Sequence, residues 1–387
     1  MRVIVLGAGR VGEAIARDLA AADRFDLTVA DVSQVALDRL AAVTGLKTER
    51  SDLASGGEIA RLVTGHDLAV GAVPGPMGFA TLGRVIETGV NVVDISFFEE
   101  ESWPLNQLAM DRGVTAVMDC GVAPGCSNLI LGRAEASWER VEAFRCYVGG
   151  LPVARHWPYQ YRVVYSPIDV IAVYTRPARL VEGGEVVTRP ALTEIEALDF
   201  DGVGTLEAFN TDGLRTLLKT SKVPEMKEKT MRYPGHCEQM CMLRDTGFFG
   251  EDPIEVGDAM VRPIDVTAEL LIPAWQLEEG EEDVTVMRIE IDGVVEGERV
   301  RRRYDLLDRY DHETGITSMA RTTGYTCTAM VNAIADGLYS EPGLSPPELV
   351  GRNQACFDFV FDYLAERGVR FSITEETFGV KSYELRV

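Results

Sequence analysis

The chain has 387 residues, which favours about two domains, and its 46% hydrophobic and 26% charged residues are typical of a globular protein. It carries 38 basic and 61 acidic side chains, a formal net charge of −23. Such a chain repels the phosphates of nucleic acid and the surface of anionic membranes, so we expect neither as a partner. No apolar run reaches the ~20 residues of a membrane helix, and the first residues do not resemble a signal peptide, which predicts a cytoplasmic protein.

Seven cysteines are distributed at irregular spacings, which indicates reduced thiols in a reducing compartment. The tightest group is His236, Cys237 and Cys241. This group lacks a second pair of ligands at the spacing of a zinc site, so we expect no metal.

The amino-terminal third alternates short β-branched runs with amphipathic segments of helical period. We expect strands at residues 2–6, 27–31, 46–50, 67–72, 91–94 and 115–118. We expect helices at residues 11–22, 33–44, 57–63, 78–88 and 102–112. This alternation predicts an α/β fold with a doubly wound parallel sheet, whose ligands lie at the carboxyl ends of the strands.

A glycine-rich turn, Gly7-Ala8-Gly9-Arg10-Val11-Gly12, joins the first strand to the first helix. Gly7 permits the tight turn, Gly9 lets the backbone approach a pyrophosphate, and Gly12 allows the helix to pack closely on the strand. The free amides and the positive dipole end at the start of the helix suit phosphate groups. The turn therefore predicts a dinucleotide-binding Rossmann domain, which we place at residues 1–122.

Asp31 ends the second strand, where a carboxylate accepts hydrogen bonds from the ribose hydroxyls of NAD and repels the 2′-phosphate of NADP. No arginine follows it directly, since the next residues are Val32 and Ser33. Asp31 therefore favours NAD over NADP.

Further candidates for the cofactor site lie at or just past the ends of later strands. They are Asp52, Val73, Pro74, Asp94, Ser96, Cys120 and Gly121. Asp119 directly precedes Cys120 and lies nearest to the expected position of the nicotinamide. A turn or N-cap role is an equally good interpretation for Asp94 and Asp119.

After residue 125 the regular alternation of short strands and helices ends. We expect a helix at residues 125–137 and longer alternating strands at residues 141–149, 160–165, 170–180, 206–210, 284–292 and 299–308. Few crossover helices separate these strands, which predicts a mostly antiparallel or mixed sheet in a substrate-binding and dimerisation domain at residues 123–315. Helices at residues 318–338 and 353–366, within a segment at 316–387, are expected to return to the Rossmann domain. Residues 278–283 are expected to form a solvated loop.

The chain resembles the saccharopine dehydrogenase family over nearly its full length and is similar to the L-lysine 6-dehydrogenase branch. Beside the glycine turn, the matching strings are DCGVAPG at 119–125 with Ser127 and Asn128, VGGLP at 148–152, YSP at 165–167, YTRP at 174–177, FNTDGLRTL at 209–217 and EKTMRYPGH at 228–236. The resemblance implies a Rossmann domain, a second α/β domain with a mixed sheet, and a homodimer or higher oligomer. It also implies NAD-dependent oxidation at the ε-carbon of lysine to the semialdehyde, which closes to a cyclic imine while ammonia is released.

This chemistry requires a base, because the ε-ammonium must lose a proton before the neighbouring carbon can lose a hydride. His236, within the last of the matching strings, and Asp119, beside the expected nicotinamide, are the two candidates. His236 is equally well interpreted as a capping or packing residue, and the sequence leaves the choice of base open.

The α-carboxylate of such a substrate needs a cation, and an arginine fork is the natural clamp. Arg176, Arg215 and Arg232 lie within the matching strings, although each is also well interpreted as part of a structural ion pair. Asp212 is our candidate for the α-ammonium. Further candidates for the substrate pocket are Asn128, Asn210 and Thr211.

Three functions remain open at this point. The first is oxidative deamination of lysine, and the second is the saccharopine-type oxidation of a secondary amine. The third is an NAD-binding regulatory protein without turnover. Saccharopine carries three carboxylates, so its pocket should contain more arginines than a pocket for lysine.

Overall fold

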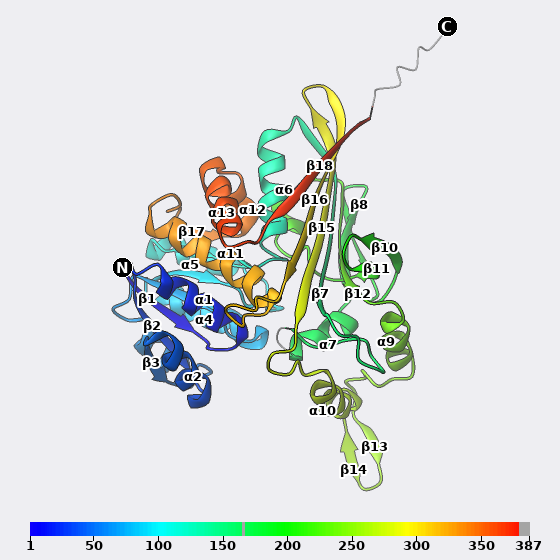
Figure 1. The fold of residues 1–387 in the computed structure, drawn as a ribbon, viewed down its shortest axis with the longest axis horizontal. Coiled ribbons are helices and arrows are strands. Elements are labelled where there is room, and N and C mark those ends of the chain that lie inside the picture. Colours follow the sequence, from blue (N-terminus) through cyan, green and yellow to red (C-terminus); the bar gives the residue numbers. More distant parts are fainter. Residues whose placement is uncertain (165–166, 379–387) are drawn as a thin grey trace.

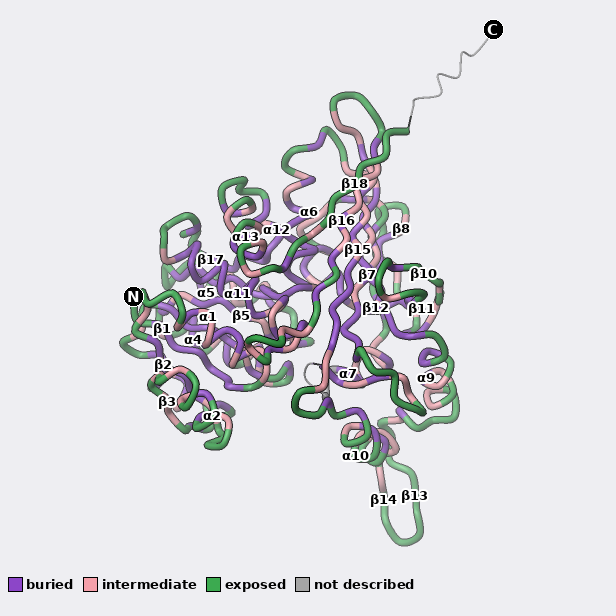
Figure 2. The backbone as a smooth tube through the Cα atoms, in the orientation of Figure 1, coloured by how far each residue is buried: buried purple, intermediate pink, exposed green. Residues whose placement is uncertain are grey.

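The computed structural model describes residues 1–164 and 167–378. The chain builds two large sheets that lie beside one another, with most strands of the first from the amino-terminal part and most strands of the second from the middle of the chain (Figure 1). The central strands of both sheets run through buried regions, whereas β18 (Phe371–Phe378) and a hairpin at the far end of the second domain are exposed (Figure 2).

In the described residues, the first sheet has seven parallel strands in the order β17-β6-β5-β4-β1-β2-β3. Its strands are β1 (Arg2–Leu6), β2 (Asp26–Asp31), β3 (Lys47–Arg50), β4 (Leu68–Gly71), β5 (Asn91–Asp94), β6 (Thr115–Val117) and β17 (Gly343–Ser345). The helices between the first six are α1 (Arg10–Ala21), α2 (Gln34–Thr44), α3 (Gly56–Val63), α4 (Gly75–Glu87) and α5 (Pro104–Arg112). The predicted doubly wound parallel sheet is therefore confirmed.

The sequence of β1 explains why it occupies the middle of this sheet. Val3, Ile4, Val5 and Leu6 are all fully buried. Val3 and Val5 belong to one hydrophobic cluster, while Ile4 and Leu6 belong to another. Successive side chains of a strand point to opposite faces, so a continuous apolar run suits a strand that is covered by helices on both sides.

The second sheet is mixed, because β7 and β12 pair in parallel while the other neighbouring strands pair antiparallel. Its strands are β7 (Arg140–Pro152), β8 (Ala178–Glu182), β9 (Glu185–Arg189), β10 (Glu196–Phe200), β11 (Gly204–Asn210), β12 (Glu225–Arg232), β15 (Asp283–Val295), β16 (Glu298–Arg309) and β18 (Phe371–Phe378). A separate hairpin consists of β13 (Ile254–Val256) and β14 (Ala259–Val261). The remaining helices are α6 (Cys126–Ser137), α7 (Pro167–Thr175), α8 (Leu217–Thr220), α9 (His236–Asp245), α10 (Pro263–Trp275), α11 (Ser318–Ala335), α12 (Pro347–Gly351) and α13 (Gln354–Glu366).

Two predicted strands of the second domain are wrong. The structure forms helix α7 up to Thr175 and begins β8 only at Ala178, where the sequence predicted one strand at residues 170–180. A short buried apolar run suits either structure, so its periodicity does not decide between them. Residues 160–164 form only an isolated bridge between Val163 and Gln276, and residue 165 of that predicted strand lies outside the described residues.

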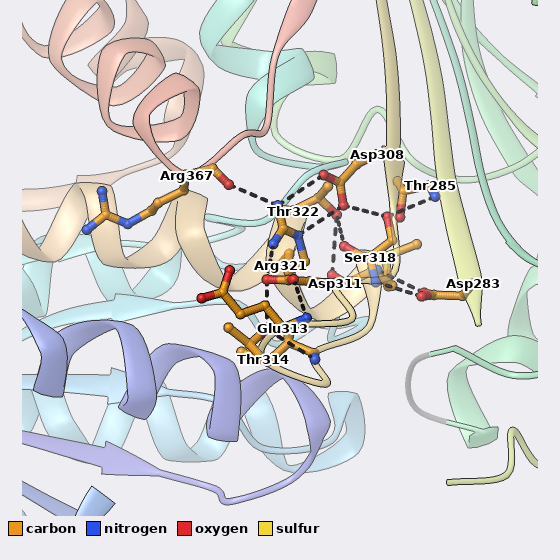
Figure 3. Close-up of polar contacts among 12 residues, drawn as sticks. Asp283, Thr285, Asp308, Asp311, Glu313, Thr314, Ser318, Arg321, Thr322 and Arg367 are labelled. Atoms are coloured by element: carbon orange, nitrogen blue, oxygen red, sulfur yellow. Dashed lines mark hydrogen bonds and ion pairs between the residues drawn. The ribbon is translucent and has the colours of Figure 1, made fainter. Parts of the chain in front are cut away.

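The predicted solvated loop at residues 278–283 is wrong at its last residue. Asp283 is fully buried and begins β15, where its carboxylate accepts hydrogen bonds from the amides of Ser318 at 2.6 Å and Met319 at 3.0 Å. Asp308 of β16 accepts a further bond from the Ser318 hydroxyl at 2.7 Å (Figure 3). Asp283 thus supplies acceptors to two of the orphan backbone amides at the start of α11, while Asp308 fixes the Ser318 side chain.

In the carboxyl-terminal segment, α11 packs on the first domain, whereas β18 joins the second sheet beside β16. Helix α11 lies along α1, where Gly324 leaves room for the side chains of Ala14 and Ile15. Asp18 of α1 accepts hydrogen bonds from Tyr363 and from Arg367, both at 2.7 Å. The segment also adds the short strand β17 to the first sheet, beside β6. The division of the chain at residues 122 and 315 stays a prediction.

Within residues 1–164 and 167–378, every helix is too short or too polar to cross a lipid bilayer.

Candidate active site

A cavity of about 860 Å³ lies between the glycine turn of the first domain and the residues of α7 and β12 in the second. This position agrees with the general rule that open α/β sheets bind ligands beyond the carboxyl ends of their strands. The cavity is large enough for a small-molecule site.

The glycine turn has the geometry that a pyrophosphate requires. A Cβ on Gly7, whose φ is +116°, would lie 2.3 Å from the Ala72 carbonyl oxygen, and a Cβ on Gly12 would lie 2.1 Å from the Gly7 carbonyl oxygen. A Cβ on Gly9, in contrast, would meet no atom within 4 Å, so this residue faces the open cavity. No side chain caps the start of α1, which leaves its first amides available to phosphate oxygens.

Two backbone amides hold the Asp31 carboxylate in place at the end of β2. One carboxylate oxygen accepts a hydrogen bond from the Ala8 amide at 2.6 Å and the other accepts one from the Ser33 amide at 2.7 Å. Asp31 and Asp52 both line the cavity. They place negative charge where the adenosine ribose of a dinucleotide would lie.

Arg10 joins the glycine turn to the second domain. Its guanidinium donates one hydrogen bond to the Val163 carbonyl at 2.9 Å and another to the Leu277 carbonyl at 2.7 Å. The same side chain lines the cavity. A residue of the nucleotide turn is therefore tied directly to the opposite wall.

The other predicted cofactor residues fall into two groups. Those that line the cavity are Val11, Val73, Pro74, Ser96 and Gly121. Asp94 and Cys120 are buried and lie outside the described cavity lining. Asp94 accepts hydrogen bonds from the Ser96 amide at 2.9 Å and hydroxyl at 3.2 Å, and burial raises its pKa to about 8. This arrangement fits the turn role that the sequence also allowed for Asp94.

Asp119 forms a buried ion pair with Arg215. Arg215 Nε donates to Asp119 Oδ2 at 2.8 Å, and the Arg215 guanidinium also donates to the Phe98 carbonyl. Burial raises the pKa of Asp119, while the charge of Arg215 opposes that rise. Neither side chain belongs to the described lining of the cavity. The pair therefore lies behind the wall rather than on it.

His236 is fully buried at the start of α9 and is also absent from the described cavity lining. Its Nδ1 lies 2.8 Å from the Tyr159 carbonyl oxygen, which can only accept, so Nδ1 carries the hydrogen. Its Nε2 then accepts from the Tyr174 hydroxyl at 2.9 Å, and that hydroxyl accepts from Arg232 Nε at 3.1 Å. Burial, and secondarily the charge of Arg232, lowers the pKa of His236 to about 3. His236 thus orients Arg232 through Tyr174.

Two predicted arginines reach the cavity. Arg176, directly after α7, pairs with Glu99, and its buried Nε has no hydrogen-bond partner in the described residues. Arg232 of β12 is held against the ring of Tyr161, with its guanidinium carbon 4.4 Å from the ring centroid. Both are placed to receive an anionic group of a ligand.

The predicted polar residues of the substrate pocket also divide. Thr211 and Asp212 line the cavity, although Asp212 forms a two-pronged ion pair with Arg179. Asn128 donates to Glu348 at 3.0 Å, and Asn210 donates to Thr193 at 3.3 Å. Neither asparagine belongs to the described lining, and both side chains bind other residues of the protein.

Glu228 is a residue of the cavity wall that the sequence did not single out. It lies on β12, a strand that was not predicted because three consecutive charged residues at 227–229 interrupt the alternation of apolar and polar residues. The side chains of Glu228, Thr230 and Arg232 share the cavity-facing side of this strand. The signal available in the sequence was its place as the first residue of the matching string at 228–236.

The geometry defines the class of protein: a nicotinamide-nucleotide-dependent dehydrogenase with a Rossmann domain and a second, substrate-binding domain. Residues 3–117 match the family model of the saccharopine dehydrogenase NADP binding domain, and residues 121–369 match that of the saccharopine dehydrogenase C-terminal domain. The chain belongs to the saccharopine dehydrogenase family.

Relatives that align with most of this chain are named as dehydrogenases. The saccharopine dehydrogenase [NADP(+), L-glutamate-forming] of Schizosaccharomyces pombe is 22% identical over 95% of this chain and 97% of its own. The carboxyaminopropylagmatine dehydrogenase of a Synechocystis species is 21% identical over 89% of this chain and 91% of its own. The apo structure of saccharopine dehydrogenase (L-Glu forming) from Saccharomyces cerevisiae has the same fold, with a TM-score of 0.78 at 19% identity over 98% of this chain and 100% of that chain. The protein is thus an oxidoreductase of this family that acts on amino-acid or amine substrates.

Proposed function

We propose that the protein catalyses the NAD-dependent oxidative deamination of the ε-amino group of L-lysine, which yields the semialdehyde and ammonia. The observation that carries the proposal is a single cavity lined by the nucleotide-binding turn at one end and by Arg176 and Arg232 at the other. NAD, when bound along the turn, supplies the acceptor for a hydride. A cytoplasmic location and a homo-oligomeric state stay predictions.

The charges of the second-domain end support a substrate with one carboxylate. Arg176 and Arg232 are the arginines of that end in the described lining, and Asp212 and Glu228 are its acids. One carboxylate of the substrate can occupy an arginine, while an ammonium group is attracted to the acids. A substrate with three carboxylates would bring more negative charge than these two arginines neutralise.

The cavity wall between the arginines and the acids of the second-domain end suits an aliphatic chain. Val148, Ala172, Val173 and Ile272 line this part of the cavity. Apolar side chains accommodate the methylene groups of lysine and exclude water from the reacting carbon. The carboxylate is oriented by Arg232, whose guanidinium is held in place by Tyr174 and His236.

The choice of NAD rests on Asp31. Its carboxylate lines the cavity and is already bound to two amides, so it cannot turn away from a 2′-phosphate without losing both bonds. Fixed negative charge at this position favours a free ribose hydroxyl.

A second candidate is saccharopine-type oxidation of a secondary amine, which the name of the Schizosaccharomyces pombe relative favours. One assay separates the candidates. The purified protein is mixed with NAD or NADP and with lysine, saccharopine or a diamine, and both cofactor reduction and ammonia are measured. Lysine oxidation gives NADH and ammonia in equal amounts. Oxidation of saccharopine gives reduced cofactor and an amino acid without ammonia. Cofactor binding without reduction by any amine identifies an NAD-binding regulatory protein.

A further inference from the structure

We infer that Glu228 removes the proton from the reacting amine, an assignment that rests on the proposed amine oxidation and names its base. Neither residue that the sequence offered for this role lies on the cavity surface in the described lining. Asp119 is bonded to Arg215 behind the wall, and His236 is turned toward Tyr159 and Tyr174.

The position of Glu228 fits the role. Its side chain lines the cavity while the residue remains only 5% exposed. Among the described residues, no side chain or amide donates a hydrogen bond to its carboxylate, in contrast to Asp31, Asp94 and Asp212. A cavity-lining carboxyl that accepts no hydrogen bond from the described residues is free to pair with a ligand, and an ammonium group is the natural partner.

Gly213 creates the space that Glu228 occupies. A Cβ on Gly213 would lie 1.7 Å from Glu228 Oε1 and 2.0 Å from its carboxyl carbon. Any larger residue at 213 would therefore displace the carboxyl from its recess. The sequence FNTDGL at 209–214 thus has a direct steric link to a residue on another strand.

Burial and the charged groups around Glu228 place its pKa in a range that suits a base. Burial raises its pKa to about 8, the negative charges of Asp212 and Asp119 act in the same direction, and Arg215 acts against them. Cys146, opposite Glu228 on β7, remains a neutral thiol because burial raises its pKa well above the usual value. A base is most effective when its pKa lies near the working pH. Glu228 can therefore both accept the proton and release it afterwards.

The proton balance is simple. The Glu228 carboxylate accepts one proton from the ε-ammonium, and the nitrogen keeps the electron pair of that N–H bond. This pair forms the C=N bond as the neighbouring carbon loses a hydride, for which the proposed function supplies the acceptor. Water then adds to the carbon, and ammonia leaves.

Position along β12 also predicts which end of the substrate reacts. Glu228 and Arg232 are four residues apart on one strand face, which separates their Cα atoms by ~13 Å. Of this pair, Glu228 is the residue near Asp119 and Arg215. Asp119 follows the end of β6, on the side expected for the nicotinamide. The amine therefore reacts beside Glu228 while the carboxylate is held at Arg232.

The test compares Glu228→Gln with a control on the same strand, Glu225→Gln, whose side chain is exposed. We expect Glu228→Gln to lower kcat/KM for lysine by about 100-fold or more. In the parent, kcat/KM should fall as the pH drops below about 8, because Glu228 becomes protonated. The remaining activity of Glu228→Gln should not show this fall, and Glu228→Asp should restore part of the rate. NADH binding, followed by fluorescence, should be the same in all variants. A Glu228→Gln enzyme with the parental rate and pH profile would overturn the assignment.

A binding measurement gives a readout that does not depend on turnover. Lysine is titrated calorimetrically into the complex with NADH at pH 7 in buffers of different ionisation enthalpy. We expect the parent to release close to one proton, because the bound ammonium ionises Glu228, and Glu228→Gln to release none. Equal proton release by both proteins would contradict the role of Glu228. Lysine that binds but is not oxidised by the parent would refute the proposed function alone, while absence of both binding and oxidation for every amine would remove both.

Discussion

Arg215 and Asp119 bind each other with both backbones in the left-handed region. Their φ angles are +46° and +53°, and the bond between Nε and Oδ2 is 2.8 Å long. Positive φ is uncommon outside glycine and concentrates at functional sites, where the surroundings must hold it in place. The pair connects the end of β6 to the segment before α8 and so fixes the wall that carries Glu228.

Removing one member of this pair should destabilise the protein strongly. Arg215→Met leaves the Asp119 carboxylate buried without its counter-ion, for which we expect a loss of about 3–5 kcal/mol in the free energy of unfolding. Adding Asp119→Asn should recover part of that loss, because the uncompensated charge disappears. Urea denaturation of the two single variants and the double variant measures the coupling. Additive losses would show that the ion pair contributes little.

Gly213→Ala should be damaging only while Glu228 is present. The added methyl group would overlap the Glu228 carboxyl, so we expect lower stability and a loss of activity in this single variant. In a Glu228→Ala background the space is free, and the same change at 213 should cost less than about 0.5 kcal/mol of stability. A double-mutant cycle by urea denaturation gives the coupling energy. Equal costs in the two backgrounds would contradict the steric contact.

The nucleotide end of the site was predictable because local rules determine it. The turn from Gly7 to Gly12 must combine positive φ and close backbone approach, and only glycine allows both. Asp31 follows from the strand pattern that places it at the edge of the sheet. Each of these features is specified within a few residues of sequence.

The substrate end was less predictable because it depends on contacts between distant segments. Glu228, on β12, fits beside the cavity only because Gly213, in the loop after β11, leaves room for its carboxyl. His236 looked like a base by its chemistry, and only the packing of Tyr159 and Tyr174 around it shows that both ring nitrogens are engaged. Helix α7 escaped prediction because a buried apolar run carries no periodicity.

Asp31→Ser should shift the cofactor preference. The change removes the carboxylate that would repel a 2′-phosphate, so we expect the ratio of kcat/KM for NADP to that for NAD to rise by about 10-fold or more, about 1.4 kcal/mol. Asp38→Asn, on the exposed side of α2, serves as the control for a lost negative charge nearby. A parental ratio in Asp31→Ser would show that another group selects the cofactor.

Asp283 should make stability depend on pH in a direction opposite to that of a surface carboxylate. Burial raises its pKa to about 6, whereas an aspartate in the unfolded chain titrates near 3.9. Between these values the native state holds more protons than the unfolded state, so its stability falls as the pH rises. The full effect is about 3 kcal/mol and is complete about one pH unit above the folded-state pKa of about 6.

Asp283→Asn tests this because it keeps an acceptor for the amides of Ser318 or Met319 but cannot ionise (Figure 3). The free energy of unfolding of the parent, minus that of the variant, should decrease steadily from pH 4 to pH 6.5. Asp358→Asn, exposed on α13, should give a nearly flat difference over the same range. Since Met319 also lines the cavity, the cap at the start of α11 links the second sheet to the wall of the site. A flat difference for Asp283→Asn would mean that this carboxyl is already ionised at pH 4 in the folded protein.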